Sequence, residues 1–521
     1  MSRPGSMRYD PPVDRLRPDT ILGIDLGTTN SCGAVVMPGG QVKIVPQRSG
    51  DGIVPSVFAI DEKGHELVGH EAKRQWQLNP RNTLYATKRL IGRSPHDEVV
   101  AGVQRSVAFR VVPGPGEEVA LACQGQRFQV QEVSARILAK IRDVASDFLG
   151  FRVARAVVTV PAYFTDRQRQ AVKAAGRLIG LEVVRIINEP TAAALAYGIG
   201  RRLRERVLVF DLGGGTFDVS IIEIRDRVFE VKATGGDIFL GGLDFDDAIV
   251  GQVLERFRAE HGLDLTQDPV AMQRIRDLAE RSKIDLSSRS EVPFSIPFVT
   301  MTDDGRPVSL EQRLGRRELE RLTFPLVERA LRMVERVMRD AGLAPHDVDE
   351  VLLVGGQTRM PLIQRMLGDW FGRPPSKGVH PDEAVAIGAA LYAWSLQDDS
   401  DLKLQLLDVI PMAIGIEAAG GAMRTVLPRN APIPNAKAIP ATSSLDGQRE
   451  LSVRIYQGDH PEAVRNDLLG EFTFGGVRPS PAGQVRLEIL FEVSVEGILT
   501  VSARDLDTGK QMRTTVRVTE S

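Results

Sequence analysis

The chain has 521 residues, which is longer than one hydrophobic core usually grows, so two or more domains are expected. Hydrophobic residues make up 42% of the sequence and charged residues 26%, a composition typical of folded proteins that excludes a fibrous or disordered chain. The 66 basic and 68 acidic side chains give a formal net charge of -2, too small a field to attract nucleic acid or anionic lipid.

The N-terminal segment, residues 1–20, contains four arginines and several prolines but no apolar stretch, so it lacks the core of a secretory signal. We expect it to be a disordered tail. The two cysteines, Cys32 and Cys123, are too few for a disulfide framework and suit a reducing compartment. The sequence contains no uncharged apolar run long enough to predict a membrane span, so the expected location is the cytoplasm.

Residues 21–397 alternate short β-branched runs with helical periodicity, as in RAVVTV, then DRQRQAVKAAGRLIG, then VVRIINEP. This alternation predicts an α/β domain with sheets covered by helices. Residues 21–36 (ILGIDLGTTNSCGAVV) also resemble residues 206–222 (RVLVFDLGGGTFDVSII), each reading as strand, Asp-Leu-Gly turn and strand. The domain therefore reads as an internal duplication with two similar lobes.

The composition changes near Gln397. Residues 398–409 run from an acidic spacer into a leucine-rich strip, and we interpret them as an interdomain linker. Residues 410–521 contain short alternating runs such as LSVRIYQG, RLEILFEV and GILTVSA, separated by glycine, proline, asparagine and aspartate turns. This pattern predicts an all-β sandwich.

Both Asp-Leu-Gly turns place an aspartate, Asp25 or Asp211, at the end of an apolar strand and before a glycine. Glycine lets backbone N–H groups approach an anion, and the carboxylate can hold Mg²⁺ through its waters. One such motif is more often an ordinary turn, but two copies point to a polyphosphate clamp. A third turn, VLLVGGQTRM, leaves room for a flat ligand at Gly355 and Gly356, although it could also be a plain strand-to-helix corner.

Several longer strings resemble the nucleotide-binding domain of the 70-kDa heat-shock chaperones, in particular the bacterial DnaK type. They are IDLGTTNS, NTLYATKRLIGR, VTVPAYFTDRQRQA, INEPTAAALAYG, VFDLGGGTFDVS, LGGLDFD, LVGGQTRMP and HPDEAVAIGAA. The resemblance extends in order from about Ile21 to Val518. It implies an α/β, duplicated actin-like ATPase domain of two lobes, an all-β peptide-binding domain, and ATP-dependent chaperone activity. Actins and sugar kinases share the fold but lack these strings.

The resemblance implies that the ATPase domain binds ATP or ADP with Mg²⁺, with K⁺ as a further candidate. Asp25 and Asp211 match the residues that orient the metal. The implied catalytic set is Lys88, Glu189, Asp211, Thr216 and Asp218. The implied nucleotide-binding set is Asp25, Gly27, Thr28, Thr29, Asn30, Gly213, Gly214, Gly215, Thr216, Gly241, Gly242, Glu280, Lys283, Ser287, Gly355, Gly356, Gln357, Arg359 and Asp382.

Without the motifs, several of these residues would be interpreted differently. Lys88 would read as a solvated cation, and Glu189, which precedes Pro190, as a helix-dipole partner. Glu280 and Lys283 are three residues apart on a predicted helix, where a surface ion pair is the simple alternative. Ile284 stands where animal relatives usually carry an arginine that stacks on the base.

Residues 404–409 (LQLLDV) resemble the family's linker, which docks on the nucleotide domain when ATP is bound, although the segment could equally be an edge strand. The implied interdomain coupling set is Pro161, Arg169, Lys173, Arg185, Leu406, Leu407 and Asp408. The implied peptide-binding set is Ile416, Ala419, Ser444, Leu451 and Val453. As apolar residues on predicted strands, Ile416, Leu451 and Val453 could instead belong to the sandwich core.

The implied partners are unfolded or extended polypeptides, a J-domain cochaperone and a GrpE-type nucleotide exchange factor. We expect no nucleic-acid or membrane partner and a monomeric protein. The sequence ends after TTVRVTES, so the resemblance predicts a member without the helical lid. Two other classes stay open: a metabolic kinase on the same ATPase fold, and an adaptor that senses nucleotide without refolding a client.

Overall fold

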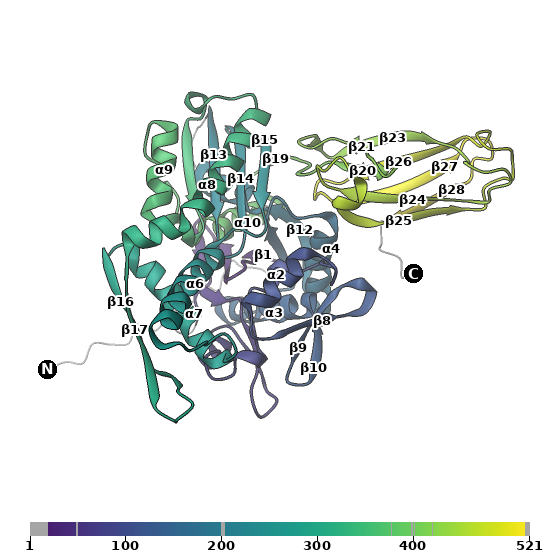
Figure 1. The fold of residues 1–521 in the computed structure, drawn as a ribbon. Coiled ribbons are helices and arrows are strands. Elements are labelled where there is room, and N and C mark those ends of the chain that lie inside the picture. Colours follow the sequence, from purple (N-terminus) through teal and green to yellow (C-terminus); the bar gives the residue numbers. More distant parts are fainter. Residues whose placement is uncertain are drawn as a thin grey trace.

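The computed structural model describes residues 19–47, 50–199, 204–376, 378–397, 400, 402–418 and 420–515. An α/β region formed by the first three quarters of the chain stands beside a β module formed by the rest (Figure 1). Within the described residues, no helix combines the length and apolar character that crossing a bilayer requires. The predicted disordered tail is residues 1–20. All of them except Asp19 and Thr20 lie outside the described ranges.

The first lobe is built on a six-stranded sheet whose strands are rich in Val, Ile and Leu, as expected when both faces are covered. The strands follow one another in the order β12 (Glu182–Asn188), β11 (Arg155–Val160), β1 (Ile21–Asp25), β2 (Asn30–Val36) and β3 (Val42–Ile44), with β4 (Ile53–Pro55) also paired to β2. Strand β1 runs parallel to β11 and antiparallel to β2.

The second lobe repeats this arrangement. Its sheet has the order β18 (Glu350–Val354), β13 (Arg204–Leu212), β14 (Phe217–Arg225), β15 (Val228–Asp237), β19 (Gln405–Val409) and β22 (Pro432–Ile433). Strand β13 runs parallel to β18 and antiparallel to β14, as β1 does with β11 and β2. The two Asp-Leu-Gly turns therefore join equivalent strand pairs.

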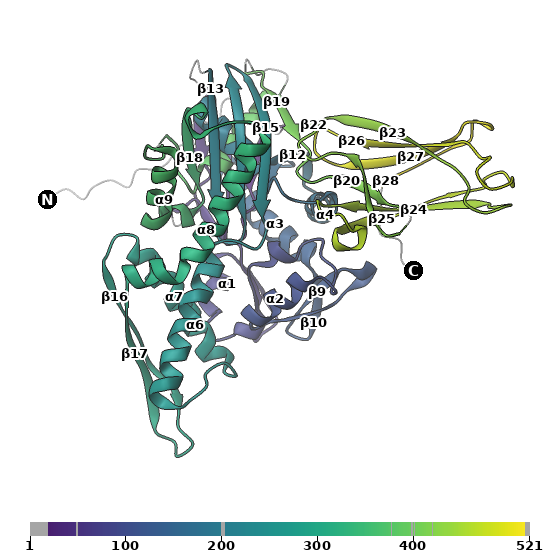
Figure 2. The ribbon, with the colours of Figure 1, turned by 45° about the horizontal axis from the view of Figure 1, so that its top comes forward.

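Helices cover both sheets (Figure 2). The first lobe contains α1 (His70–Gln75), α2 (Glu98–Ser106), α3 (Val130–Leu149) and α4 (Asp166–Leu178). The second contains α6 (Gly242–His261), α7 (Pro269–Leu286), α8 (Arg316–Asp340) and α9 (Pro361–Phe371). Helices α5 (Glu189–Gly198) and α10 (Ala384–Ser395) pack together between the sheets, in a buried cluster that draws apolar residues from both lobes.

Local sequence explains where key helices begin. Helix α4 starts after Thr165, whose side chain accepts a hydrogen bond from the Gln168 amide in a capping box. Helix α5 has Pro190 in its first turn, where proline costs no hydrogen bond. Short 3₁₀ turns carry further site residues, including η2 (Thr87–Leu90) and η5 (Gly356–Arg359); the others are η1 (Pro80–Asn82), η3 (Pro115–Glu117), η4 (Pro345–Asp347) and η6 (Ala463–Arg465).

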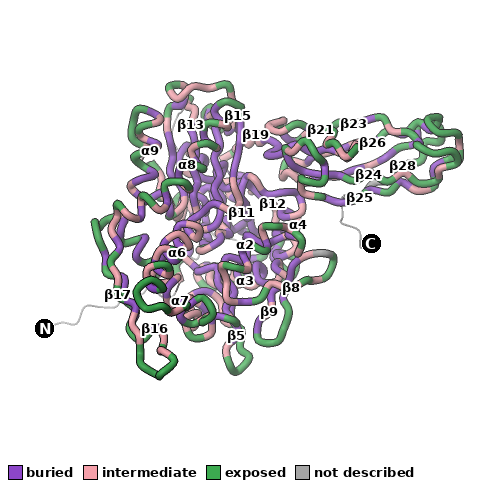
Figure 3. The backbone as a smooth tube through the Cα atoms, viewed as in Figure 1, coloured by how far each residue is buried: buried purple, intermediate pink, exposed green. Residues whose placement is uncertain are grey.

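Three small antiparallel sheets extend from the lobes, and Figure 3 shows exposed residues at their loops. They are β5 (Phe58–Ile60) with β6 (Glu66–Val68) and β7 (Thr83–Leu84); β8 (Arg110–Pro113) with β9 (Val119–Cys123) and β10 (Gln126–Gln129); and β16 (Glu291–Met301) with β17 (Pro307–Gly315).

The β module is a sandwich of two four-stranded sheets around one apolar core. The first sheet has the order β21 (Met423–Leu427), β20 (Ile414–Glu417), β24 (Glu450–Gln457) and β25 (Asp467–Gly475). The second has the order β23 (Asn435–Ala441), β26 (Leu487–Val493), β27 (Leu499–Asp505) and β28 (Gln511–Thr515). The structure thus contains an α/β part and a separate β domain.

The segment interpreted as a linker forms strand β19 at the edge of the second lobe's sheet. Its residues Gln405–Leu407 pair in parallel with β15, and its last two residues pair with β22, which belongs to the chain after residue 410. The sheet of the second lobe therefore continues into the β domain, and the two parts are joined by backbone hydrogen bonds as well as by the covalent chain.

Candidate functional site

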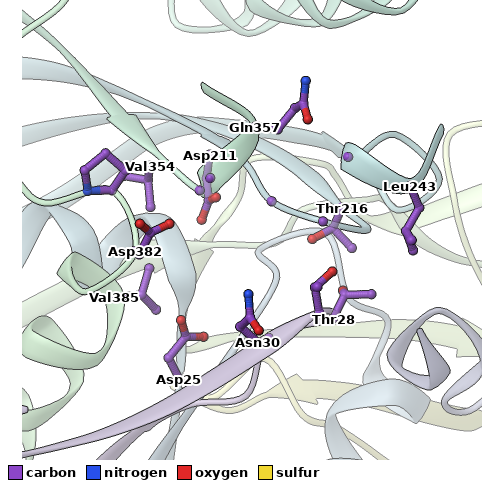
Figure 4. Close-up of a pocket in the computed structure, with 18 of the residues that line it drawn as sticks. Asp25, Thr28, Asn30, Asp211, Thr216, Leu243, Val354, Gln357, Asp382 and Val385 are labelled. Carbon is purple, nitrogen blue, oxygen red and sulfur yellow. The ribbon is translucent and has the colours of Figure 1, made fainter. Parts of the chain in front are cut away.

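A cavity of about 380 Å³ opens between the two lobes, where their Asp-Leu-Gly turns meet. Figure 4 shows Asp25, Thr28 and Asn30 on one side of this pocket and Asp211 and Thr216 on the other. Most of the nucleotide set expected from the sequence lines it, namely Asp25, Gly27, Thr28, Thr29, Asn30, Gly213, Gly214, Thr216, Gly242, Glu280, Lys283, Gly355, Gly356, Gln357, Arg359 and Asp382. Lys88, Glu189 and Asp211 of the expected catalytic set also line it.

The two turns pack directly against each other, which explains their glycines. A Cβ atom on Gly214 would lie 1.9 Å from Thr29 Oγ1, and one on Gly215 would lie 2.3 Å from Thr28 Cγ2. Gly241 is equally restricted, since its Cβ would lie 2.6 Å from the Gly215 nitrogen. A side chain at Gly214 or Gly215 would push against the first lobe, and one at Gly241 would displace the second glycine turn itself.

The carbonyl groups of the second glycine turn accept hydrogen bonds from the start of helix α6 and from Arg89 of the first lobe. Gly213 O accepts from Gly242 N and Gly214 O from Leu243 N, both at 2.9 Å, while Gly215 O accepts from Arg89 Nε at 2.9 Å. This arrangement leaves amide N–H groups of the turn for an anion, next to the N-terminus of a long helix. The turn is suited to bind phosphate oxygens.

Lys88 and Glu189 form a buried ion pair at the floor of the cleft. Lys88 Nζ lies 2.6 Å from Glu189 Oε1, and the two side chains are only 6% and 8% exposed. Lys88 is carried by η2 and Glu189 opens helix α5, so the pair joins segments 101 residues apart. Lys88 is therefore a fixed cation facing the phosphate turns, and it is not a solvated surface residue.

Three further carboxylates crowd the same floor. Burial, and then the charge of Glu189, raises the pKa of Asp25 to about 7 and that of Asp218 to about 8, and raises the pKa of Asp211 well above its usual range. A site with this excess of negative charge favours a cation. Asp25 and Asp211 line the cavity and offer the hard oxygen ligands that Mg²⁺ prefers, so these residues fit the metal.

The third glycine turn lies beside the second. Gly355 has a φ of 82°, and a Cβ there would lie 2.3 Å from the Leu212 carbonyl oxygen, so the position requires glycine. On the same side of the cavity, Arg359 Nη2 donates to Asp382 Oδ2 at 2.6 Å. Ile284 also lines the cavity and is 60% exposed, which leaves an uncharged rim where a base would rest.

Glu280 and Lys283 do not form the surface ion pair considered as an alternative. Glu280 Oε2 lies 3.5 Å from Lys73 Nζ of the first lobe, whereas Lys283 Nζ lies 2.9 Å from Asp246 Oδ1 and donates to Gly242 O at 2.7 Å. Burial raises the pKa of Asp246 to about 7 despite this lysine. Both residues are thus part of the cleft wall.

Four expected site residues do not line the cavity: Gly215, Asp218, Gly241 and Ser287. Gly215 and Gly241 act from behind, through the packing described above. Asp218 accepts from the Tyr163 amide at 3.2 Å, and Ser287 Oγ lies 3.5 Å from the Lys283 carbonyl oxygen, its acceptor one turn earlier.

Two of the expected coupling residues, Arg169 and Asp408, are joined through Asn188 beneath the cleft. Asp408 Oδ2 accepts from Asn188 Nδ2 at 2.8 Å and from Thr191 Oγ1 at 3.2 Å. The Asn188 Oδ1 in turn accepts from Arg169 Nη2 at 2.8 Å, and Arg169 also donates to the carbonyl of Ala162, next to Pro161. Since Asn188 directly precedes Glu189, a short polar path joins the docked strand β19 to the cleft floor.

Lys173 contacts the β domain directly, and its partner was not among the residues expected from sequence. Lys173 Nζ lies 2.5 Å from Glu496 Oε2, and Glu496 Oε1 accepts from the Ile186 amide at 3.0 Å. Arg185 precedes Ile186 on β12, and its buried Nε has no hydrogen-bond partner among the described residues. Of the linker leucines, Leu406 packs against the cluster between the lobes, and Leu407 is half-buried.

Three of the expected peptide-binding residues, Ile416, Leu451 and Val453, are partly buried and pack against the sandwich core. Ser444 is exposed, and its amide donates to Gln448 Oε1 at 2.7 Å. Ala419 lies outside the described residues. The three apolar candidates therefore lie at the edge of the sandwich core. This position is compatible with a peptide-binding groove and also with a purely structural role.

Sequence reasoning missed Arg89, Asp166, Asn188, Thr191 and Glu496, which link the cleft, the linker and the β domain. The strings NTLYATKRLIGR and INEPTAAALAYG contain three of them, so motif position was the only available signal.

The amino-acid sequence matches a family model over residues 21–521, which is almost the whole chain. Members of that family are ATPases that act as chaperones, bind ATP or ADP with Mg²⁺, and engage unfolded polypeptides and cochaperones. The matching model is described as Hsp70 protein, and this chain belongs to the Hsp70 family.

Proposed function

We propose that this protein uses ATP binding and hydrolysis in the actin-like cleft to switch its β domain between weak and tight grip on extended polypeptide. The observation that carries the proposal is the polar path from Glu189 through Asn188 to Asp408 of the docked linker strand. A change at the cleft floor reaches the linker within two residues. Such a linker is a two-state element that nucleotide can bias.

In the proposed reaction, the glycine turns and Thr28 and Thr29 hold the phosphates. Asp25 and Asp211 would hold Mg²⁺, and the bound ion would supply charge neutralisation at the transferring phosphoryl group. Lys88 adds fixed positive charge beside it, and Glu189 and Thr216 orient the attacking water. Asp218 lies behind the cavity lining, where its Oδ1 accepts a hydrogen bond from the Tyr163 amide. Positioning and charge neutralisation supply most of the rate.

We further propose a bacterial-type, DnaK-like member that works in the cytoplasm with a J-domain cochaperone and a GrpE-type exchange factor. The uncharged Ile284 at the cleft rim supports the bacterial type, and Arg169, which reaches Asp408 of β19 through Asn188, and Lys173, which pairs with Glu496, support a coupling surface. The peptide would add to the β domain as an extended segment, with Ile416, Leu451 and Val453 offering apolar contact.

The test is release of a fluorescent apolar peptide from the ADP-loaded protein after rapid mixing with ATP. We expect ATP to accelerate release by about tenfold or more, within the usual range of allosteric coupling. Mixing with ADP is the control. The variant Thr216→Ala should still release peptide on ATP binding while hydrolysing slowly. Peptide release that ignores ATP, in a protein shown to bind ATP, would instead indicate an adaptor.

A further inference from the structure

Arg89 links the two lobes immediately behind the phosphate turn. Its side chain is 6% exposed, and Nε donates to Gly215 O at 2.9 Å while the guanidinium pairs with Asp244 of helix α6. Asp244 in turn accepts from the Gly241 amide at 2.8 Å. Arg89 belongs to the first lobe and all its partners to the second, so these bonds depend on lobe closure.

The same guanidinium faces the ring of Phe239, with Arg89 Cζ 5.9 Å from the ring centroid. Phe239 lies in the turn between β15 and α6 and packs against the apolar core of the first lobe. A second guanidinium contacts the same ring, since Arg93 Cζ also lies 5.9 Å from the Phe239 centroid. One aromatic side chain from the second lobe is therefore shared by two arginines of the first, within cation–π range.

Arg93 then reaches the β domain. Its Nη1 donates to Asp467 Oδ1 at 3.0 Å, across 374 residues, and lies 3.6 Å from Asp97 Oδ2. The Arg93 side chain is only 7% exposed, whereas Asp467, at the start of β25, is 37% exposed. A guanidinium with little hydration binds its carboxylate more strongly than one that water surrounds.

We propose that Arg89, Phe239 and Arg93 form a second connection between the phosphate turn and the β domain, independent of the linker. It rests on the proposed function, since it is a further route for the same coupling. Closing the lobes on nucleotide puts Phe239 over both arginines and keeps water from Arg93. The Arg93–Asp467 ion pair is then strong and holds β25 against the first lobe. Opening the lobes removes the ring, hydrates Arg93 and weakens that pair.

The test is a double-mutant cycle in the full chain with Phe239→Leu and Asp467→Asn, since only direct cycles establish coupling. Docking of the β domain is measured by energy transfer between dyes on the two domains, in ATP and in ADP. We expect each single variant to reduce the ATP-induced docking constant by about three- to tenfold, the range of one partly buried contact. The double variant should lose little more than either alone.

The matched control is Arg336→Gln. Arg336 lies on α8 of the second lobe, and its Nη2 donates to Asp459 Oδ2 of the β domain at 2.7 Å, so the variant removes another interdomain Arg–Asp pair. Its effect should add fully to that of Phe239→Leu. Additive effects in both cycles would overturn the proposed connection, as would ATP-independent docking of the unmodified protein. Nucleotide-dependent docking without ATP-triggered peptide release would overturn the chaperone function instead, while the cycle still decides the connection.

Discussion

The nucleotide cleft and the interface with the β domain both bury charged side chains, but they satisfy them differently. In the cleft, Asp25, Glu189, Asp211 and Asp218 surround one lysine, and burial raises the pKa values of the three aspartates. At the interface, several buried charges reach a group of the other domain. Asp166, for example, accepts from the Leu499 amide at 2.8 Å.

This difference separates the two tasks. The cleft floor holds more negative charge than Lys88 can balance, so it gains most from a bound cation such as Mg²⁺. The interface is balanced by the protein itself, so nucleotide can only change it indirectly, by moving the elements that carry the charges. Substitutions in the cleft should therefore affect chemistry, and substitutions at the interface should affect coupling.

The largest effect should come from Lys88→Ala. Removing Lys88 from the cleft floor leaves Glu189 without its paired lysine and takes away fixed positive charge near the reacting phosphate, so single-turnover ATP hydrolysis should fall about a hundredfold or more. ATP binding should change far less, because the glycine turns stay in place.

Lys73→Ala is the matched control, since Lys73 pairs with Glu280 at the cleft wall, at 3.5 Å. It should alter nucleotide release more than the hydrolysis step. Equal hydrolysis rates in Lys88→Ala and the unmodified protein would contradict the assigned role of Lys88.

At the interface, Asp408→Asn should weaken coupling without stopping chemistry. The carboxylate accepts from Asn188 and Thr191, and an amide at this site keeps the shape but loses the charge that faces Arg169. We expect peptide stimulation of the ATPase and ATP-triggered release both to fall about tenfold, a typical coupling energy. Basal hydrolysis, measured alongside, should change little. A normal response to peptide would mean that β19 is a passive tether.

Domain docking should also depend on pH through Asp166. Burial raises the pKa of Asp166 to about 6 in the docked structure, whereas a hydrated aspartate has a pKa of about 4. Docking is therefore coupled to uptake of a proton at Asp166. Docking should therefore strengthen severalfold as the pH falls from 7 to 5. Interdomain energy transfer without nucleotide measures this change. Asp166→Asn, which can still accept from the Leu499 amide, should flatten the profile; an unchanged slope would assign it to other groups.

The smallest effect should appear at the rim of the cleft, where Ile284 lines the cavity but is 60% exposed. An arginine at this position could stack on the base, and an exposed cation–π contact contributes about 0.5–1 kcal/mol. Ile284→Arg should therefore slow ADP dissociation about two- to fivefold, as followed with a fluorescent ADP analogue. Ile284→Leu should leave the rate unchanged, and faster release from the arginine variant would argue against stacking.

The cleft was largely predictable because its residues act through local backbone chemistry. An Asp-Leu-Gly string at the end of an apolar strand marks a turn that can approach an anion, and Asp25 and Asp211 lie at such strand ends and line the cavity. The partners were not predictable. Helical spacing places Glu280 and Lys283 on one face, but tertiary contacts with Lys73 and Asp246 decide their pairing.

The interface was less predictable for the same reason. The Lys173–Glu496 contact joins positions 323 residues apart, and the Arg89 contact with Gly215 joins positions 126 apart. Neither glutamate nor arginine stands out locally in a chain with 134 charged side chains, the sum of 66 basic and 68 acidic residues. Closure of the two lobes brings Arg89 to Gly215, and docking of the β domain brings Glu496 to Lys173.

Strand β19 has a mechanical consequence. Three of its residues bond to β15 and its last two to β22, so this short ribbon at a sheet edge carries part of any pulling force on the β domain, beside side-chain pairs such as Arg336–Asp459. A load applied across that ribbon opens its hydrogen bonds one after another, which takes less force than shearing them together. A pull on the β domain would therefore peel strand β19 from the sheet edge before it unfolds either domain.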